Sequence, residues 1–156
     1  MPEKSVLFVC LGNICRSPLA EAAFRKLADE AGLQVEADSA GTGSWHLGDP
    51  PDPRAQATAR SHGVDISGYQ ARQVSAGDFT RFTHIIALDH SNLHNLRAVA
   101  PQNATAELSL LLDHVDGREG QEVDDPYFGG QSGFERTWSE VVAGAEGLIG
   151  RLRTQP

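Results

Sequence analysis

The ten residues from Val9 to Pro18, VCLGNICRSP, constrain the fold of this chain more than any other segment. Residues 5–9 are apolar, β-branched or aromatic, which predicts a buried strand. Pro18 suits the first turn of a helix, and apolar residues then recur at helical spacing. Residues 10–17 are therefore expected to form a turn that joins the carboxyl end of a strand to a helix. Ligands of open α/β sheets bind at this end of a strand.

The turn has the composition of an anion-binding loop. Five residues separate Cys10 from Arg16, and their backbone N–H groups can converge on one point. Together with a helix N-terminus, such a loop binds an anion with three oxygens. It needs positive φ angles, which Gly12 supplies and Asn13 tolerates. The expected phosphate-binding loop comprises Leu11, Gly12, Asn13, Ile14, Cys15 and Ser17.

The same loop predicts a nucleophile. Its field favours the ionised form of Cys10, so the thiol is expected to be a thiolate near neutral pH. Ser17 can donate a hydrogen bond to the sulfur, and the planar fork of Arg16 matches two phosphoryl oxygens as a lysine could not. The alternative is a buried strand-end cysteine beside a solvated arginine. That alternative leaves the Gly, Asn, Ser and Pro of the segment without a reason.

Strand and helix patterns alternate along the rest of the chain. The further predicted strands are residues 34–39, 83–88 and 106–112. The further predicted helices are residues 53 to about 63, 91–99 and 134–152. Ser91 is the expected N-cap of the second of these helices, and residues 40–53 and 113–133 are expected to be loops. The alternation indicates a parallel sheet with right-handed crossovers, in one α/β domain over residues 1–156.

Composition excludes several classes of function. With 21 acidic and 13 basic residues the net charge is −8, which argues against binding to nucleic acid. No apolar run is long enough to cross a bilayer and no secretory signal precedes the first strand, so we expect a cytoplasmic protein without a membrane contact. The only two cysteines, Cys10 and Cys15, exclude a disulfide framework and a multi-cysteine metal site. His90 and His94 have metal-ligand spacing, but they lack a third ligand, and two exposed helix histidines are the alternative.

A second motif offers a general acid. Phosphoryl transfer to a thiolate expels an alkoxide or phenoxide, which leaves more easily when it is protonated. Asp125 lies in a long predicted loop, and Pro126 biases it toward an extended backbone. Its neighbour Asp124 would raise its pKa, which helps a carboxyl hold a proton. An ordinary Asp-Pro turn is the alternative, and spacing alone does not decide between the two.

Three aromatic side chains lie in predicted loops, where they could wall a pocket for a flat substrate ring. They are Trp45, Tyr127 and Phe128. A small satellite cluster of apolar side chains is the alternative explanation for aromatic residues in such loops.

With the loop and the acid in view, the chain resembles the low-molecular-weight protein tyrosine phosphatases from about residue 5 to residue 152. Residues 10–18 fit the signature loop of that family, and residues 125–127 fit its general-acid loop. Further landmarks of the resemblance are Asp38-Ser39, Trp45, residues 52–55, residues 71–73 and residues 89–93. The resemblance implies a small open parallel sheet of about four strands with helices on both faces.

The resemblance also implies the catalytic roles. Cys10 would be the nucleophile, and Arg16 would clamp the phosphate and the transition state. Asp125, rather than Asp124, would be the general acid and base. No metal and no cofactor would be needed.

Supporting roles follow from the same resemblance. Asn13, held by Ser39, would keep the shape of the loop, and Ser17 would stabilise the thiolate. Cys15 would capture an oxidised Cys10 as a reversible disulfide, which protects the nucleophile from further oxidation. Trp45, with Tyr127 opposite, would flank the entrance and favour aryl phosphates.

The expected function is hydrolysis of phosphotyrosine in proteins, and of other aryl phosphate monoesters, through a phosphocysteine intermediate. The expected partners are phosphotyrosyl proteins and a cognate tyrosine kinase, and the expected state is a monomer. There are two departures from the family pattern. Phe128 stands where many members carry a second tyrosine, and Tyr69 falls near a position where several have a histidine.

Three rival functions share the loop. Thioredoxin-coupled arsenate reductases need further cysteines, and none follows Cys15, so only a variant that uses an external thiol stays open. Protein-arginine phosphatases tend to carry threonine where Ile14 stands, and the hydrocarbon of Ile14 suits a phenyl ring better. A non-catalytic phosphate-binding module would have no use for both a central cysteine and an acid.

Overall fold

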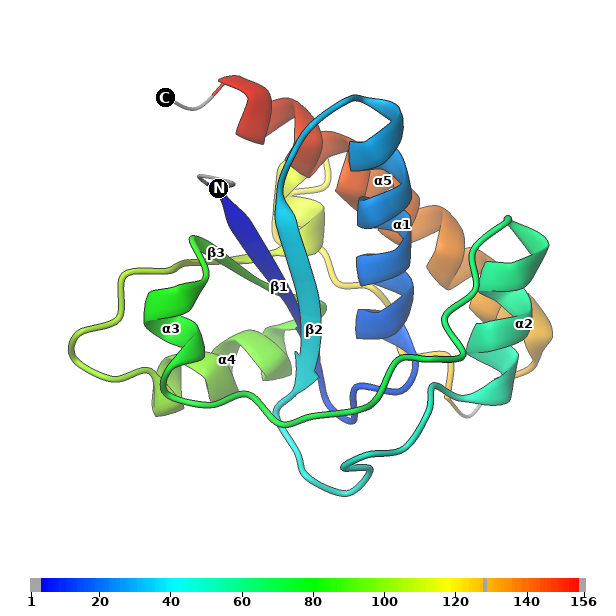
Figure 1. The fold of residues 1–156 in the computed structure, drawn as a ribbon, viewed down its shortest axis with the longest axis horizontal. Coiled ribbons are helices and arrows are strands. Elements are labelled where there is room, and N and C mark those ends of the chain that lie inside the picture. Colours follow the sequence, from blue (N-terminus) through cyan, green and yellow to red (C-terminus); the bar gives the residue numbers. More distant parts are fainter. Residues whose placement is uncertain (1–3, 128, 155–156) are drawn as a thin grey trace.

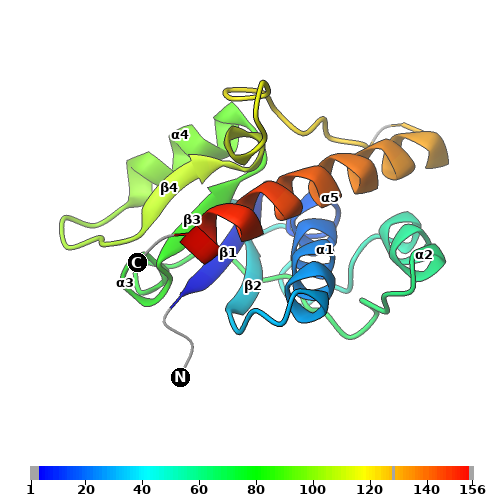
Figure 2. The same cartoon turned by 90° about the horizontal axis from the view of Figure 1, so that it is seen from above.

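The computed structural model describes residues 4–127 and 129–154, so the prediction made for Phe128 lies outside the described residues. Its centre is a parallel sheet with the strand order β2-β1-β3-β4, three strands of which are labelled in Figure 1 and all four in Figure 2. The strands are β1 (Ser5–Cys10), β2 (Glu36–Gly41), β3 (His84–Ala87) and β4 (Glu107–Leu110). The helices are α1 (Arg16–Glu30), α2 (Pro53–Ser61), α3 (Asp78–Arg81), α4 (His90–Val99) and α5 (Gln131–Thr154), with a 3₁₀ helix η1 (Leu111–His114). The predicted α/β class with about four parallel strands is confirmed.

The central strand β1 is buried on both faces, which explains why its sequence is a continuous apolar run. Successive side chains point to opposite faces. Val6 and Phe8 join the larger apolar cluster, which includes side chains of α1 and α5. Leu7 and Val9 join a smaller cluster with side chains of α3 and α4. The two views place these helix pairs on opposite sides of the sheet (Figures 1 and 2), as expected.

The direction in which the chain moves across the sheet reverses at β1. From β1 the chain passes to β2 at one edge and then returns to β3 on the other side of β1. Parallel sheets of this kind have a crevice outside the carboxyl ends of the two strands at the reversal. Those ends are Cys10 and Ala87 here. The segments that follow them, residues 11–15 and 88–89, therefore lie together at the crevice.

Several boundaries differ from the predictions. The prediction that Ser91 caps α4 is wrong: Asp89 is the N-cap, and its Oδ1 accepts a hydrogen bond of 2.7 Å from the N–H of Asn92. The short helix α3 was not predicted, because four residues are too few to show a period. Residues 111–112 were predicted to end a strand but begin η1. None of the described helices is both long and apolar enough to span a membrane.

Candidate active site

The turn between β1 and α1 is held from outside through its carbonyl oxygens. The carbonyls of Cys10, Leu11 and Ile14 accept hydrogen bonds of 2.8–2.9 Å from N–H groups of residues 42–52. Within the described part of the chain, by contrast, no N–H group of residues 11–15 donates a hydrogen bond. Five successive donors are thus left for a ligand, which is the arrangement that binds an oxyanion.

Asn13 carries the unusual backbone conformation of the loop, with a φ of 59°. Its side chain makes three hydrogen bonds that hold it there. Nδ2 donates to Ser17 Oγ at 2.8 Å and to Ser39 Oγ at 3.0 Å. Oδ1 accepts a hydrogen bond of 3.0 Å from the N–H of Arg72. The structure thus brings Asn13 and Ser39 together, and it adds a third partner from a distant loop.

Two glycines leave space around the loop. Gly12 was predicted to supply a positive φ, and that prediction is wrong, since its φ lies outside the left-handed region. A Cβ on Gly12 would instead lie 3.0 Å from Cδ2 of His46. A Cβ on Gly41, at the end of β2, would lie 2.7 Å from the carbonyl oxygen of Leu11. Close approach of the backbone, rather than backbone freedom, excludes a side chain at Gly41, whereas a Cβ on Gly12 would require the ring of His46 to move slightly.

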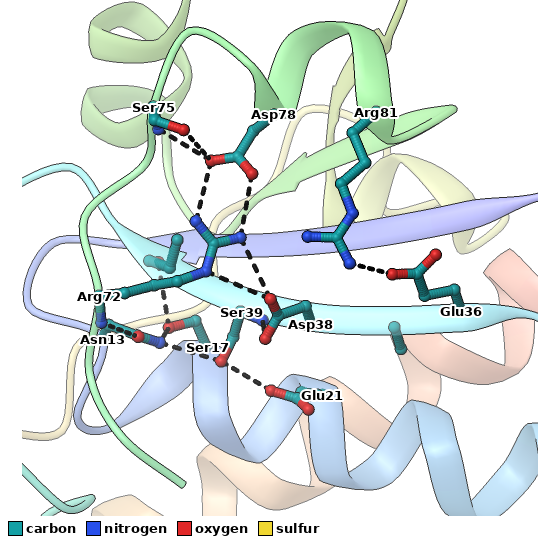
Figure 3. A network of polar contacts seen from close by, with 12 residues as sticks. Asn13, Ser17, Glu21, Glu36, Asp38, Ser39, Arg72, Ser75, Asp78 and Arg81 are labelled. Atoms are coloured by element: carbon teal, nitrogen blue, oxygen red, sulfur yellow. Dashed lines mark hydrogen bonds and ion pairs between the residues drawn. The ribbon is translucent and has the colours of Figure 1, made fainter. Parts of the chain in front are cut away.

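A chain of hydrogen bonds leads from the nucleophile into the protein, and Figure 3 shows the part of it that runs from Ser17 through Asn13 and Ser39 to Glu21. Cys10 Sγ lies 3.0 Å from Ser17 Oγ. Since that oxygen already accepts a hydrogen bond from the amide of Asn13, the hydroxyl proton of Ser17 can point at the sulfur. Ser39 Oγ donates to Oε1 of Glu21 at 2.7 Å. Burial raises the pKa of Glu21, and the hydrogen bond from Ser39 and the charge of Arg25 oppose that rise.

Arg72 anchors the other side of Asn13 (Figure 3). Its guanidinium donates to both carboxylate oxygens of Asp78, at 3.0 and 3.1 Å, and to Asp38 at 3.2 Å. Burial works to raise the pKa of Asp78, but the hydrogen bonds from Arg72 and from the N–H of Ser75 lower it below its usual value. Asp78 therefore stays charged and keeps Arg72 in place behind the loop.

Arg16 lies at the base of the pocket and is 3% exposed. Its Nη1 donates to Asp89 Oδ2 at 2.8 Å and to the carbonyl of Val123 at 2.9 Å. Its Nη2 lies 3.7 Å from Oδ2 of Asp125. Burial tends to lower the pKa of Arg16, but the negative charges of Cys10 and Asp89 raise it above its usual value. Asp89, which follows β3, and the carbonyl of Val123 thus hold the guanidinium of Arg16 charged and in one orientation.

The predicted catalytic residues line one pocket of about 260 Å³. The lining consists of Cys10, Leu11, Gly12, Ile14, Cys15, Arg16, Trp45, His46, Asp125 and Tyr127. Trp45 is 73% exposed and packs against Gly43, where a Cβ would lie 1.9 Å from the indole ring. Nucleophile, clamp and carboxylate therefore face the same space, with aromatic rings at its rim.

Cys10 and Cys15 are both buried free thiols. Burial raises the pKa of Cys15 far above its usual value, and the nearby charges of Asp52 and Cys10 raise it further. Cys15 therefore carries its proton at neutral pH. It is unsuited to be the nucleophile but available as a neutral thiol beside one.

Arg54 connects α2 to the loop that holds the carboxylate. Its guanidinium contacts both carboxylate oxygens of Asp52, the N-cap of α2, at 2.9–3.0 Å. Nη2 also donates to the carbonyl of Tyr127 at 2.8 Å, and Nη1 to that of Gly129 at 3.0 Å. The guanidinium lies 4.7 Å from the ring centre of Phe134 and 5.6 Å from that of Tyr127.

Sequence reasoning assigned no role to three residues at this site. Asp89 could have been found, because it is the first polar residue after a predicted strand, as Cys10 ends another. Arg54 and Arg72 each have a carboxylate partner nearby in the sequence, Asp52 and Asp78, but the contacts that tie them to the site reach residues up to 75 positions away. The His90–His94 pair is not brought to a site: His90 Nε2 lies 2.8 Å from the carbonyl of Gly120. Among the residues described, no group of three or more His, Cys, Asp and Glu side chains could hold a metal ion.

Comparison with known proteins decides the family. A family model described as low molecular weight phosphotyrosine protein phosphatase matches residues 5–156. The chain belongs to this family. A relative among the curated proteins, the low molecular weight protein-tyrosine-phosphatase YfkJ of Bacillus subtilis, is 44% identical over 153 residues, 97% of each chain. The resemblance drawn from the loop and acid motifs is confirmed.

Solved structures of phosphatases have the same fold as this low molecular weight phosphatase. A protein tyrosine phosphatase from Entamoeba histolytica superposes with a TM-score of 0.91 at 36% identity, over 97% of both chains. A Drosophila arginine phosphatase superposes with a TM-score of 0.90 at 35% identity, over 97% of this chain and 99% of the other. The second match shows that the fold alone does not distinguish between phosphorylated amino acids.

Proposed function

We propose that this phosphatase hydrolyses phosphotyrosine, and aryl phosphate monoesters in general, through a phosphocysteine intermediate. The observation that carries the proposal is the pocket in which Cys10, Arg16 and Asp125 meet over five unpaired N–H donors. Both cysteines of the sequence lie in this loop, so no other site among the described residues combines a thiol with an anion-binding loop and a carboxylate.

The first step transfers the phosphoryl group to sulfur. The thiolate of Cys10 attacks phosphorus, the S–P bond forms, and the P–O bond to the phenol breaks. Arg16 and the loop N–H groups bind the three equatorial oxygens, whose charge they stabilise in the transition state. Asp125 gives its proton to the departing phenolate oxygen. Ser17 is placed to stabilise the attacking thiolate through its hydrogen bond to sulfur.

The second step releases phosphate. Asp125, now ionised, accepts a proton from a water molecule whose oxygen attacks phosphorus, and the S–P bond breaks to regenerate the thiolate. The brace of Asn13, with Ser39 behind it, holds the loop in one shape through both steps. Arg16 keeps its two partners on the protein side and presents the rest of its fork to the anion.

The rim favours an aromatic substrate. Trp45 and Tyr127 line the entrance and Ile14 adds hydrocarbon within it, so a phenyl ring is better accommodated than a guanidinium. We therefore favour phosphotyrosyl proteins over phosphoarginine as substrates. A cognate kinase, a monomeric state and a cytoplasmic location stay predictions, as does the role of Cys15 in capturing an oxidised Cys10.

Two variants and a panel of substrates test this function. Cys10→Ser is expected to be inert with every substrate because it has no thiolate to phosphorylate. Asp125→Ala is expected to lose about 10²–10⁴-fold in kcat/KM with phosphotyrosine, and much less with aryl phosphates whose phenol leaves without protonation. Steady-state rates with aryl phosphates, phosphoserine, phosphoarginine and, with added glutathione, arsenate give the comparison.

Two outcomes would contradict the proposal. Aryl phosphate turnover by the Cys10→Ser protein equal to that of the wild type would exclude the phosphocysteine route. A kcat/KM higher for phosphoarginine, or for arsenate reduction, than for phosphotyrosine would assign the site to one of its rivals. Inorganic phosphate binding to the Cys10→Ser protein serves as the control for an intact loop.

A further inference from the structure

Arg54 contacts both Asp52, which is bonded to the phosphate-binding loop, and the loop that carries Asp125. On one side it binds the carboxylate of Asp52, whose own N–H donates to the carbonyl of Ile14 in the phosphate-binding loop at 2.8 Å. On the other side it donates to the carbonyls of Tyr127 and Gly129, just after Asp125. An unbroken series of polar contacts therefore runs from the anion loop to the carboxylate loop.

The carboxyl of Asp125 has little else to fix its position. Its side chain is 44% exposed, and its Oδ2 lies 3.7 Å from Arg16 Nη2, which is beyond hydrogen-bond distance. Oδ1 accepts the N–H of Tyr127 at 3.0 Å, which ties the carboxyl to its own loop but not to the pocket. The place of the carboxyl over the nucleophile therefore depends on where that loop is held.

The geometry points to Arg54 as the positioning residue for the general acid, with Asp52 as its anchor. This inference rests on the proposed function, because it concerns the proton that Asp125 gives to the leaving group. A guanidinium suits the task, since its planar fork has donors for a carboxylate and two carbonyls at once while its face lies on the ring of Phe134. A lysine has the charge but neither the fork nor the flat face.

The test separates positioning of the acid from general loss of structure. The Arg54→Lys and Arg54→Gln variants are compared with wild type for kcat/KM on aryl phosphates whose phenols have pKa values from about 4 to about 10. Arg60→Gln is the matched control, because Arg60 is an exposed arginine on the same helix. Asp52→Asn is a second probe: asparagine caps a helix as well as aspartate does, yet it gives Arg54 no charged partner.

Leaving-group dependence is the decisive readout. With the poorest leaving group we expect kcat/KM of the Arg54 variants to fall about tenfold or more, since a misplaced acid donates poorly. With the best leaving group we expect less than about a twofold change, because the phenolate needs no proton. Asp52→Asn should show a smaller loss of the same pattern, and Arg60→Gln none. In an Asp125→Ala background, Arg54→Lys should cause no further loss.

Two results would overturn the inference. Equal losses across all leaving groups would mean that Arg54 supports the site as a whole, and unchanged kinetics would mean that it supports nothing there. Multiplicative effects of Arg54→Lys and Asp125→Ala would show that the two act independently. Failure of the proposed function looks different, because it would be seen in the wild type as aryl phosphate turnover that survives Cys10→Ser.

Discussion

Asn13 shows how one side chain decides the shape of the anion loop. Among residues 4–127 and 129–154 it is the only non-glycine residue with a positive φ. A left-handed backbone costs an ordinary residue about 1–2 kcal/mol, and asparagine tolerates it better than most. Glycine would remove the strain, but it could not bind Ser17, Ser39 and Arg72 as Asn13 does. The sequence therefore has asparagine where backbone freedom alone would favour glycine.

Two substitutions at Asn13 should separate the cost of its left-handed backbone from the contribution of its three side-chain hydrogen bonds. Asn13→Ala keeps the left-handed backbone and loses all three hydrogen bonds, whereas Asn13→Gly loses the bonds but relieves the strain. We expect Asn13→Gly to be the more stable of the two by up to about 1 kcal/mol, after the greater unfolded-state entropy of glycine is subtracted. Both should bind inorganic phosphate more weakly than wild type. Urea unfolding and phosphate inhibition measure this, and equal unfolding free energies would contradict the account.

Local chemistry at the residue scale was accessible from the residues themselves, whereas the one long-range pair that was expected, Asn13 with Ser39, came from the family resemblance. The roles drawn for Cys10 and Arg16 depend on neighbours within eight positions, so their composition alone indicated the chemistry. Asp89 lies 73 positions from Arg16, and Arg72 lies 59 from Asn13. Sequence separation of that size says nothing about contact until the sheet order is known.

At the scale of elements, α5 and η1 approach each other closely. A Cβ on Gly147 would lie 1.9 Å from the carbonyl oxygen of His114, and one on Gly144 would lie 2.4 Å from the side chain of Leu111. A glycine costs a helix interior about 1 kcal/mol relative to alanine. The two glycines on one face of α5 thus lower the intrinsic helix propensity of α5, but they allow it to pack closely against η1.

Two alanine substitutions on α5 should have opposite effects. Gly147→Ala gains helix propensity but places a methyl group against backbone, so we expect the free energy of unfolding to fall by about 1–3 kcal/mol. Gly150→Ala is the matched control, because nothing lies within 4 Å of a Cβ there. It should stabilise by up to about 1 kcal/mol. Urea unfolding of both proteins is the measurement, and a stabilised Gly147→Ala would show that the contact can open at no cost.

Sequence reasoning found the four strands and the longer helices, and it missed the single-turn elements. The strand ending at Cys10 and the last helix have unmistakable patterns, and α5 begins only three residues before the predicted residue 134. The α4 cap was misplaced because Asp89 and Ser91, two positions apart, can each cap a helix, and Asp89 is the one in the β conformation. α3 and η1 are single turns that tertiary packing, and not local sequence, maintains.

For the molecule as a whole, His114 links stability to pH. Burial and, to a smaller extent, the positive charge of Arg151 together lower the pKa of His114 from 6.5 to about 4, against the opposing effects of Asp113 and Glu107. Its Nε2 lies 2.9 Å from Ser109 Oγ, and its Nδ1 lies 3.3 Å from Arg151 Nη1. The folded protein therefore holds this ring neutral, between β4 and α5.

The free energy of unfolding should consequently fall as the pH is lowered from 6.5 to 4. In that interval the unfolded chain binds a proton at His114 and the folded protein does not, so acid favours unfolding. Above pH 6.5 neither state is protonated and the contribution is constant. His114→Gln should remove this part of the slope, whereas His94→Gln, on the exposed side of α4, should keep it. Urea unfolding at a series of pH values measures the slopes, and parallel slopes for wild type and His114→Gln would contradict the assignment.

Translation makes β1 before either of its neighbours in the sheet, since residues 36–41 and 84–87 come later. Val123, which holds Arg16, emerges later still. Until those segments have left the ribosome, Cys10 has neither its ring of donors nor its guanidinium around it. In such a nascent chain the signature motif is complete, but Cys10 is an ordinary thiol. The site acquires phosphatase chemistry only when most of the polypeptide has been synthesised.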